Sequence, residues 1–243
     1  MTKNRYSISI VFLAVFIVFS NTQAQFKDII KKLTDQNQSS ESQNTDTIVS
    51  ALKEALQIGT QNSVDVLSVA DGYFGNELVK ILLPSQIKKV EPMMRSIGLG
   101  NTLDEFVLSM NRAAESAASE AGPIFIDAIK EMTITDAINI LNGDDHAATD
   151  YFREKTSDKL TEKFRPIISA QMDEVGVTKQ YKKLADGVSS NPFINLGNLD
   201  LDTYVTNKAL DGLFTIVAQE EEKIRTDPAA QVTDLLKDVF GSN

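Results

Sequence analysis

The stretch "ATDYFREKTSDKLTEKFRPIISAQM" (residues 148–172) decides the fold class, because its apolar residues recur at a helical spacing. Residues four apart lie on one face of a helix. That stripe comprises Ala148, Phe152, Thr156, Leu160, Phe164, Ile168 and Met172. Charged rows run beside it: Asp150, Glu154, Asp158 and Glu162, then Lys155, Lys159 and Lys163. The pattern predicts a long amphipathic helix with a solvated charged face, which we expect Pro166 to kink or split.

The helical period continues through most of the chain, with start and stop signals between helices. Thr102 is predicted to cap a helix that Gly122-Pro123 ends, and Thr133 is predicted to cap a later one. "VKILLP" (79–84) is predicted to be the end of a helix, with a short strand as the alternative. The chain is therefore predicted to be all-α, a single bundle-like domain of roughly eight to ten helices.

The first residues have the pattern of a secretory signal. Lys3 and Arg5 precede an apolar run at residues 8–19, and small residues precede a predicted cut ahead of Gln25. The apolar run is shorter than the roughly 20 residues that a membrane-spanning helix needs. We therefore expect residues 1–24 to be a signal peptide and the chain to be exported, with no transmembrane anchor after cleavage.

The polar composition of residues 35–46 separates the leader from the folded part. Residues 25–34 are predicted to form a short amphipathic helix, and residues 35–46 a disordered polar linker, because they contain no apolar residue. The all-helical domain is predicted to cover residues 47–243, with Asp46 or Thr47 capping its first helix.

Composition narrows the location and the partners. The chain has no cysteine, which rules out a thiol nucleophile and predicts a protein that is periplasmic or secreted and not lipid-anchored. A net charge of −10 makes nucleic acid a poor partner and argues against electrostatic binding to anionic lipid. No cofactor motif stands out, so we predict no cofactor.

The only histidine, His146, lies among aspartates in "NGDDHAATDYF" (142–152). Asp145 and Asp150 are near enough in sequence to suggest a metal site, but zinc needs three or four converging ligands and no second histidine or cysteine exists. We predict that this stretch is a helix junction, in which Asp144 or Asp145 caps the second helix. A metal site at His146, Asp145 and Asp150 is the weaker alternative.

Five polar or aromatic residues are candidates for binding a ligand or a partner. Asn111, at the edge of an apolar stripe, is predicted either to be satisfied by backbone or to line a pocket. Arg112 is predicted to pair with the acid three residues later rather than to bind an anion. Tyr73 and Phe74, which we expect to be exposed between two glycines, either plug the end of the bundle or contact a partner. Tyr151 is a candidate for lining an apolar cavity.

The order of several segments resembles a known bacterial family. "DGYFGN", "SMNRAAESA", "GDDHAATDYF" and "LTEKFRPII" together resemble the domain of unknown function 4197 over nearly all of residues 47–240. The resemblance implies an exported helical protein, and many members look like lipoproteins, from which this chain departs because it has no cysteine to be lipidated. The family has no established activity, so the resemblance implies no catalytic residue.

The sequence contains no complete catalytic set, which favours a non-enzymatic function. We expect a periplasmic binding or interaction module whose partner is another envelope protein. One alternative is a protein that binds a small apolar ligand or a lipid between its helices. A less favoured alternative is a hydrolase that uses two carboxylates facing each other in a cleft.

Overall fold

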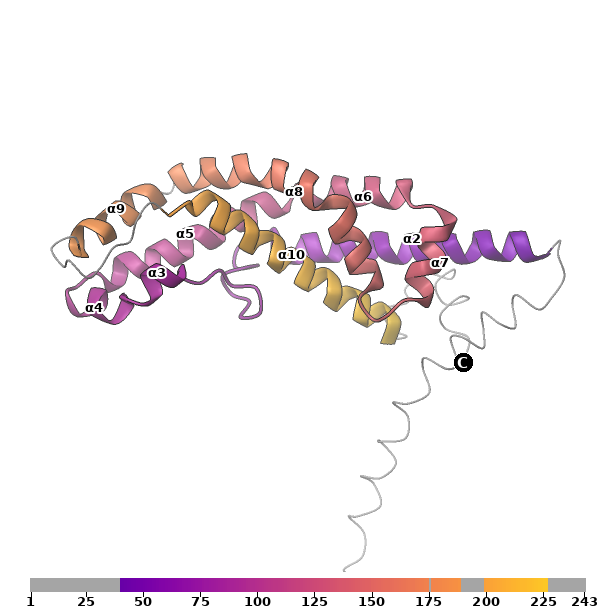
Figure 1. Ribbon diagram of the computed structural model, residues 1–243, viewed down its shortest axis with the longest axis horizontal. Coiled ribbons are helices and arrows are strands. Elements are labelled where there is room, and N and C mark those ends of the chain that lie inside the picture. The colour runs from indigo at the N-terminus through magenta and orange to yellow at the C-terminus, as the bar shows by residue number, and fades with distance from the viewer. Residues whose placement is uncertain (1–39, 175, 189–198, 227–243) are drawn as a thin grey trace, which may run out of the picture.

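The computed structural model describes residues 40–174, 176–188 and 199–226, and all regular structure in these ranges is helical (Figure 1). The helices are α2 (Ser40–Leu67), α3 (Ser85–Lys88), α4 (Glu91–Ser96), α5 (Gly100–Ala118), α6 (Ala121–Glu131), α7 (Ile134–Asn142), α8 (Ala147–Glu174), α9 (Val177–Val188) and α10 (Leu201–Thr226). The predicted all-α class is confirmed. No helix within the described ranges is long and apolar enough to cross a membrane.

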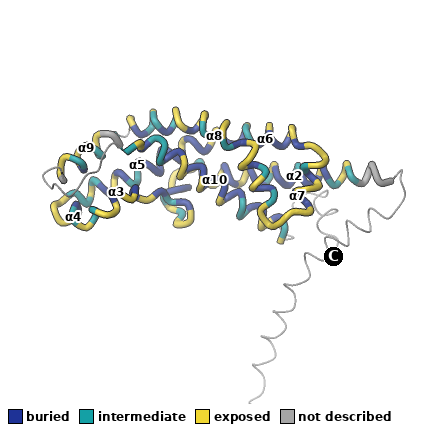
Figure 2. Tube along the Cα trace, in the orientation of Figure 1, coloured by how far each residue is buried: buried dark blue, intermediate teal, exposed yellow. Residues whose placement is uncertain are grey.

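The four longest helices, α2, α5, α8 and α10, form the body of the protein. The helix α8 packs against α10, α5 and α6, and α10 also packs against α2 and α5. The assembly is elongated, with α3, α4 and α9 at one end and α7 with the start of α2 at the other (Figure 1). Buried residues line the inner faces of these helices along the whole length (Figure 2).

The stripe predicted on α8 is the centre of the core. All seven residues of the stripe are buried. The ring of Phe152 packs edge-to-face on Phe125 of α6, at a centroid distance of 5.2 Å. Phe125 in turn meets Phe214 of α10 at 6.3 Å. Edge-to-face pairs of this kind add to the free energy that burial of the rings provides. The contacts therefore join α6, α8 and α10 through one aromatic cluster.

Several predicted helix boundaries are wrong. The helix α2 begins at Ser40 instead of at a cap on Asp46 or Thr47, and α5 begins at Gly100 instead of after Thr102. The helix α5 ends at Ala118, and Gly122-Pro123 lies in the first turn of α6. Proline fits there because the first-turn N–H groups of a helix have no partner within that helix.

Pro166 does not split α8, which continues from Ala147 to Glu174. The buried stripe extends past the proline, with Phe164 before it and Ile168 after it both fully buried. Packing of both halves of the helix on the same core outweighs the one hydrogen bond that the proline removes.

The segment "VKILLP" is neither a helix end nor a strand, because residues 80–84 have no regular structure. Its residues alternate instead, with Val79, Ile81 and Leu83 buried and Leu82 exposed. The prediction of a helix end before Pro84 is wrong because the backbone of Ile81 pairs with a side chain of α5 and the carbonyl of Leu82 with a side chain of α10. By contrast, the cap at Thr133 is confirmed, since its side chain and that of Asp136 form a reciprocal capping box.

We expect Phe152→Ala to lower the free energy of unfolding by about 3–5 kcal/mol, because it opens a cavity beside Phe125 in the aromatic cluster. Asp158→Ala on the exposed face of the same helix is the control and should change it by less than about 0.5 kcal/mol. Urea unfolding followed by circular dichroism measures both. Equal values for the two variants would contradict the central position of the α8 stripe.

Candidate functional site

The connection between α2 and α3, residues 68–84, lies along α5 and α10, and we call it the α2–α3 connector (Figure 1). Tyr73 anchors it: the side chain is fully buried, and the hydroxyl donates to the carbonyl of Ala209 on α10 at 2.7 Å. Gly212 makes room for the ring, because a Cβ at this position would lie 2.7 Å from Tyr73 Cε1 and 3.1 Å from Val79 Cβ. The connector thus depends on a close approach to α10 that only glycine permits.

Glu115 of α5 holds the start of the connector. One carboxylate oxygen accepts from the backbone N–H groups of Tyr73 and Phe74, both at 3.1 Å. The other accepts from Arg112 at 2.6 Å, and Arg112 also donates to Asp71 at 2.7 Å. The carboxylate of Glu115 is buried, so the guanidinium of Arg112 balances a charge that would otherwise be costly there.

Asn111, one turn before Glu115 on α5, holds the end of the connector. Its Oδ1 accepts from the N–H of Ile81 at 2.8 Å, while its Nδ2 donates to the carbonyl of Ile81 at 2.9 Å. Nδ2 also donates to the carbonyl of Val107 at 2.7 Å. A fully buried side chain thus pairs with both polar groups of one peptide residue, as the backbone of a neighbouring strand would. The first of the two roles predicted for Asn111 is confirmed.

Phe74 lies at the surface of the connector beneath two cations. The ammonium of Lys80 is 4.2 Å from the ring centroid, and the guanidinium of Arg112 is 5.9 Å from it. Both distances suit a cation–π interaction.

The helix α10 also holds the connector, because Tyr204 donates its hydroxyl to the carbonyl of Leu82 at 2.9 Å. The backbone of the connector is therefore held from both flanking helices.

Large exposed apolar side chains are concentrated in sequence in the connector and in the last turn of α2 before it. Among the described residues, seven large apolar side chains are strongly exposed, and four of them lie between residues 66 and 82. Leu78 is 66% exposed, Leu82 58%, Val69 55% and Val66 48%. An apolar surface on backbone that is held in place is typical of an interaction site. We therefore take the outer face of residues 66–82 as the candidate site.

Burial and charge fix the protonation states inside the connector. Burial raises the pKa of the Tyr73 hydroxyl, and the nearby carboxylate of Glu115 raises it further. Hydrogen bonding to Glu115 raises the pKa of Arg112, and the bond to Asp71 adds to this. Tyr73 therefore acts as a hydrogen-bond donor and Arg112 as a permanent cation, which are structural roles rather than acid–base ones.

Four of the five candidate residues from the sequence come together here: Asn111, Arg112, Tyr73 and Phe74. The expectation that Tyr73 is exposed is wrong, because Gly212 lets its ring enter the core. Tyr151 lies elsewhere, on α8, where its hydroxyl donates to the carbonyl of Ala128 at 3.1 Å. Burial is also the main cause that raises the pKa of Tyr151.

Sequence reasoning missed Glu115 as the partner of the connector backbone, and it missed the outer leucines. Glu115 lies four residues after Asn111, so the two side chains share a helix face, and this spacing was a usable signal. Nothing in the local sequence distinguishes the exposed Leu78 and Leu82 from the buried Leu83.

The structure gives no support to a metal site at the histidine. His146, Asp145 and Asp150 are all exposed, and the described part of the chain contains no group of three His, Cys, Asp or Glu side chains placed to hold a metal ion. The stretch is a junction between α7 and α8, as predicted, and the carboxylate of Asp144 accepts from the N–H of His146 at 3.0 Å.

Much of the capping of α8 comes from a distant residue. The N–H groups of Ala148 and Thr149 in its first turn donate to the buried carboxylate of Glu221 on α10, at 3.0 and 2.8 Å. Arg225, which lies one turn after Glu221 on α10, donates to the same carboxylate at 2.7 Å. The sequence predicted that Asp144 or Asp145 would cap these two amides, but Glu221 does so instead. Its buried carboxylate accepts from both N–H groups, and its negative charge suits the positive end of the helix dipole.

A small cavity lies beside this cap, lined by Leu52, Ala55, Leu56, Ile140, Leu141, Ala148, Glu221, Ile224 and Arg225. Its volume is about 20 Å³, which is room for about one water molecule. Pockets for small ligands have volumes of about 300–1,000 Å³. Neither Asn111 nor Tyr151 lines this cavity, so it does not fit the apolar-ligand alternative.

The buried acids that a carboxylate hydrolase would need are engaged with cations and amides. Glu115 pairs with Arg112 and Glu221 with Arg225, while Glu220 pairs with Lys223 and accepts from Asn62 at 2.9 Å. Each of these three carboxylates therefore holds parts of the fold together.

Asn111→Ala should lower the free energy of unfolding by about 2–6 kcal/mol, because it leaves two buried polar groups of Ile81 unpaired at about 1–3 kcal/mol each. Asn142→Ala, which removes an exposed amide on α7, is the control and should cost less than about 0.5 kcal/mol. Urea unfolding of both variants measures the difference. A cost below about 1 kcal/mol for Asn111→Ala would show that the connector does not depend on this amide.

The comparisons with known proteins agree with the resemblance seen in the sequence. No curated protein and no solved structure matches the chain. The family described as "Protein of unknown function (DUF4197)" matches residues 42–241, which include the whole α2–α3 connector and every helix from α3 to α10. The chain therefore belongs to this DUF4197 family.

Proposed function

We propose that this protein is a non-enzymatic interaction module of the bacterial cell envelope, which binds another envelope protein through the outer face of residues 66–82. The observation that carries this proposal is that Val69, Leu78 and Leu82 are strongly exposed on a connector whose backbone is held from inside, with Val66 exposed in the last turn of α2 just before it. Exposed apolar residues that are close together on a surface are typical of a contact site, and this spacing in sequence is the basis of the proposal.

The firmly held backbone makes this surface suited to binding. Asn111, Glu115 and Tyr204 engage the backbone of the connector, and the ring of Tyr73 fills the space beneath it. A surface that is ordered before binding loses little conformational entropy when a partner arrives. The exposed leucines are therefore presented at fixed positions instead of on a segment that must first become ordered.

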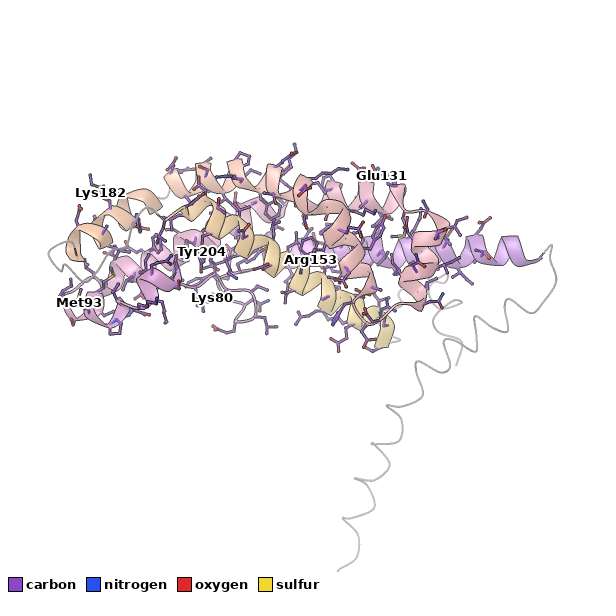
Figure 3. The ribbon with its side chains drawn as sticks, viewed as in Figure 1. Lys80, Met93, Glu131, Arg153, Lys182 and Tyr204 are labelled. Carbon is purple, nitrogen blue, oxygen red and sulfur yellow. The ribbon has the colours of Figure 1, made fainter. Side chains whose placement is uncertain are left out.

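The polar groups around the leucines indicate the chemistry of the partner. Lys80, which is labelled in Figure 3, lies in sequence between Leu78 and Leu82. Its ammonium lies over the ring of Phe74. An apolar centre with a charged residue at its edge is the usual anatomy of a protein–protein interface. The complementary partner is a protein with an apolar patch and a carboxylate placed to meet Lys80.

The location in the envelope rests on the N-terminal sequence. Lys3, Arg5 and the apolar run at residues 8–19 support export, and the absence of cysteine supports a protein without a lipid anchor. The amphipathic helix predicted at residues 25–34 lies outside the described residues. We do not adopt the apolar-ligand alternative, because the cavity beside Glu221, at about 20 Å³, is too small for such a ligand.

Photo-crosslinking in cells tests the proposal. A photoreactive amino acid at position 78 or 82 of the full chain should give a discrete crosslinked species, while the same amino acid at Ile138, an exposed apolar position on α7, should not. Mass spectrometry then identifies the partner, which is purified for binding measurements.

The purified partner should bind Leu78→Ser/Leu82→Ser at least about tenfold more weakly than the wild type, since buried interface leucines carry binding energy. Ile134→Ser/Ile138→Ser is the matched control, because it also replaces two exposed apolar residues, and it should bind as the wild type does. If position 138 crosslinked as strongly as position 78, or if the leucine variant bound normally, the site would be wrongly placed.

A further inference from the structure

Positive charge gathers at one end of this acidic protein. Residues 85–99 and 176–188, which carry α3, α4 and α9, contain six basic and two acidic residues in a chain of net charge −10, and they adjoin Asp173 and Glu174 at the end of α8. The basic residues are Lys88, Lys89, Arg95, Lys179, Lys182 and Lys183, and the acidic ones are Glu91 and Asp186. These helices form one tip of the long axis, which we call the basic end (Figure 1).

The lysines of α9 share its outward face. Lys179, Lys182 and Lys183 are three or four residues apart and all exposed, while Leu184 on the opposite face is fully buried and Tyr181 packs on the core. Figure 3 shows Lys182 on the outside of α9 at this tip of the molecule. The three ammonium groups therefore point into solvent from one surface.

Few of these charges are neutralised by neighbours. Glu91 accepts from Lys88 at 2.8 Å and from Arg95 at 3.0 Å, and Arg95 also pairs with Asp104 at 2.7 Å. Within the described ranges, no ion pair is formed by Lys89 or by the three outward lysines of α9. The basic end thus presents several cations that are uncompensated within those ranges.

An exposed apolar residue lies beside these cations. Ile97 is 51% exposed in the turn between α4 and α5, which Gly98 forms with a φ of 87°. A Cβ at Gly187 in the last turn of α9 would lie 4.0 Å from Ile97 Cδ1 and 2.6 Å from Leu99 Cδ1. The turn therefore packs against α9, and Ile97 emerges next to the helix that carries the lysine face.

We infer that the basic end binds the surface of an anionic phospholipid bilayer, with the lysines at the headgroup phosphates and Ile97 in the interfacial layer. A cationic face next to a protruding aliphatic side chain is the combination that peripheral membrane proteins use. The ammonium of lysine lacks the rigid bidentate geometry of the arginine guanidinium. It therefore suits a layer of many phosphate headgroups better than a single carboxylate in a fixed position.

The net charge of −10 does not oppose this contact. Charges farther than about 10 Å from the bilayer are screened at moderate ionic strength, so the local lysines decide the interaction once the tip touches the surface. The net charge is a sum over the whole chain, whereas the fold brings the basic residues of α3, α4 and α9 to one tip.

Vesicle co-sedimentation of the full chain tests this inference. We compare vesicles of phosphatidylcholine alone with vesicles of equal parts phosphatidylcholine and phosphatidylglycerol. Binding through any other apolar segment should be equal on both kinds of vesicle, so the ratio of the two affinities reports the preference for anionic lipid. The preference for the anionic vesicles should fall about 100-fold in Lys179→Gln/Lys182→Gln/Lys183→Gln, at about fivefold for each lysine. Salt should reduce the preference of the wild type in the same direction.

The matched control is Lys155→Gln/Lys159→Gln/Lys163→Gln, which removes three exposed lysines from α8 and should keep the preference. Ile97→Ser should weaken binding to both kinds of vesicle roughly tenfold, since it removes an apolar contact. Circular dichroism checks that all variants are folded.

The inference is overturned if the wild type shows no preference for phosphatidylglycerol, or if the α8 control loses as much binding as the α9 variant. Binding of the α9 lysines to poly-aspartate without any lipid preference would also overturn it, and would make the basic end a protein-binding surface. These outcomes are separate from the fate of the leucine surface, which the crosslinking experiment tests.

Discussion

The fold depends on pairing the buried polar groups of a backbone segment that has no regular structure. An unpaired buried N–H or carbonyl costs as much as a lost hydrogen bond, and a segment lying on a helical core cannot find its partners in a sheet. Asn111 and Glu115 of α5 solve this problem for the α2–α3 connector. Without them the connector would have to leave its position against α5 and α10, and Tyr73 would leave the core with it. The same solution recurs where Glu221 pairs with the first-turn amides of α8.

This arrangement separates the two faces of the connector. The inner face, with Val79, Ile81 and Leu83, is set by packing and hydrogen bonds, so substitutions there change stability. The outer face makes no such contribution, and a polar residue at Leu78 or Leu82 would cost the fold little. Large apolar residues at positions that folding does not require are the expected result of selection for contact with another molecule.

Local patterns predicted the helices well and the connector poorly, for a physical reason. The stripe on α8 and the capping box of Thr133 and Asp136 repeat over three or four residues, within the span of one helical turn. The connector depends on pairs that lie 30 to 42 residues apart with α5 and 122 to 136 residues apart with α10, and the cap of α8 depends on pairs 72 and 73 residues apart. Asn111 was nevertheless recognisable, because a polar residue at the edge of an apolar stripe needs a partner somewhere. No local pattern, however, identified Ile81 as the partner of Asn111.

The positions of the two proposed surfaces are compatible with each other. The basic end occupies the tip of the long axis, whereas the connector lies partway along the body, beside α5 and α10 (Figure 1). Contact of Ile97 and the α9 lysines with a bilayer therefore uses side chains other than Leu78 and Leu82. A protein held at a membrane by its tip keeps the outer face of the connector free for a partner, and confinement to the surface raises the local concentration at which that partner meets it. Weak binding at the tip is then sufficient, because it needs only to restrict where the leucine surface is found.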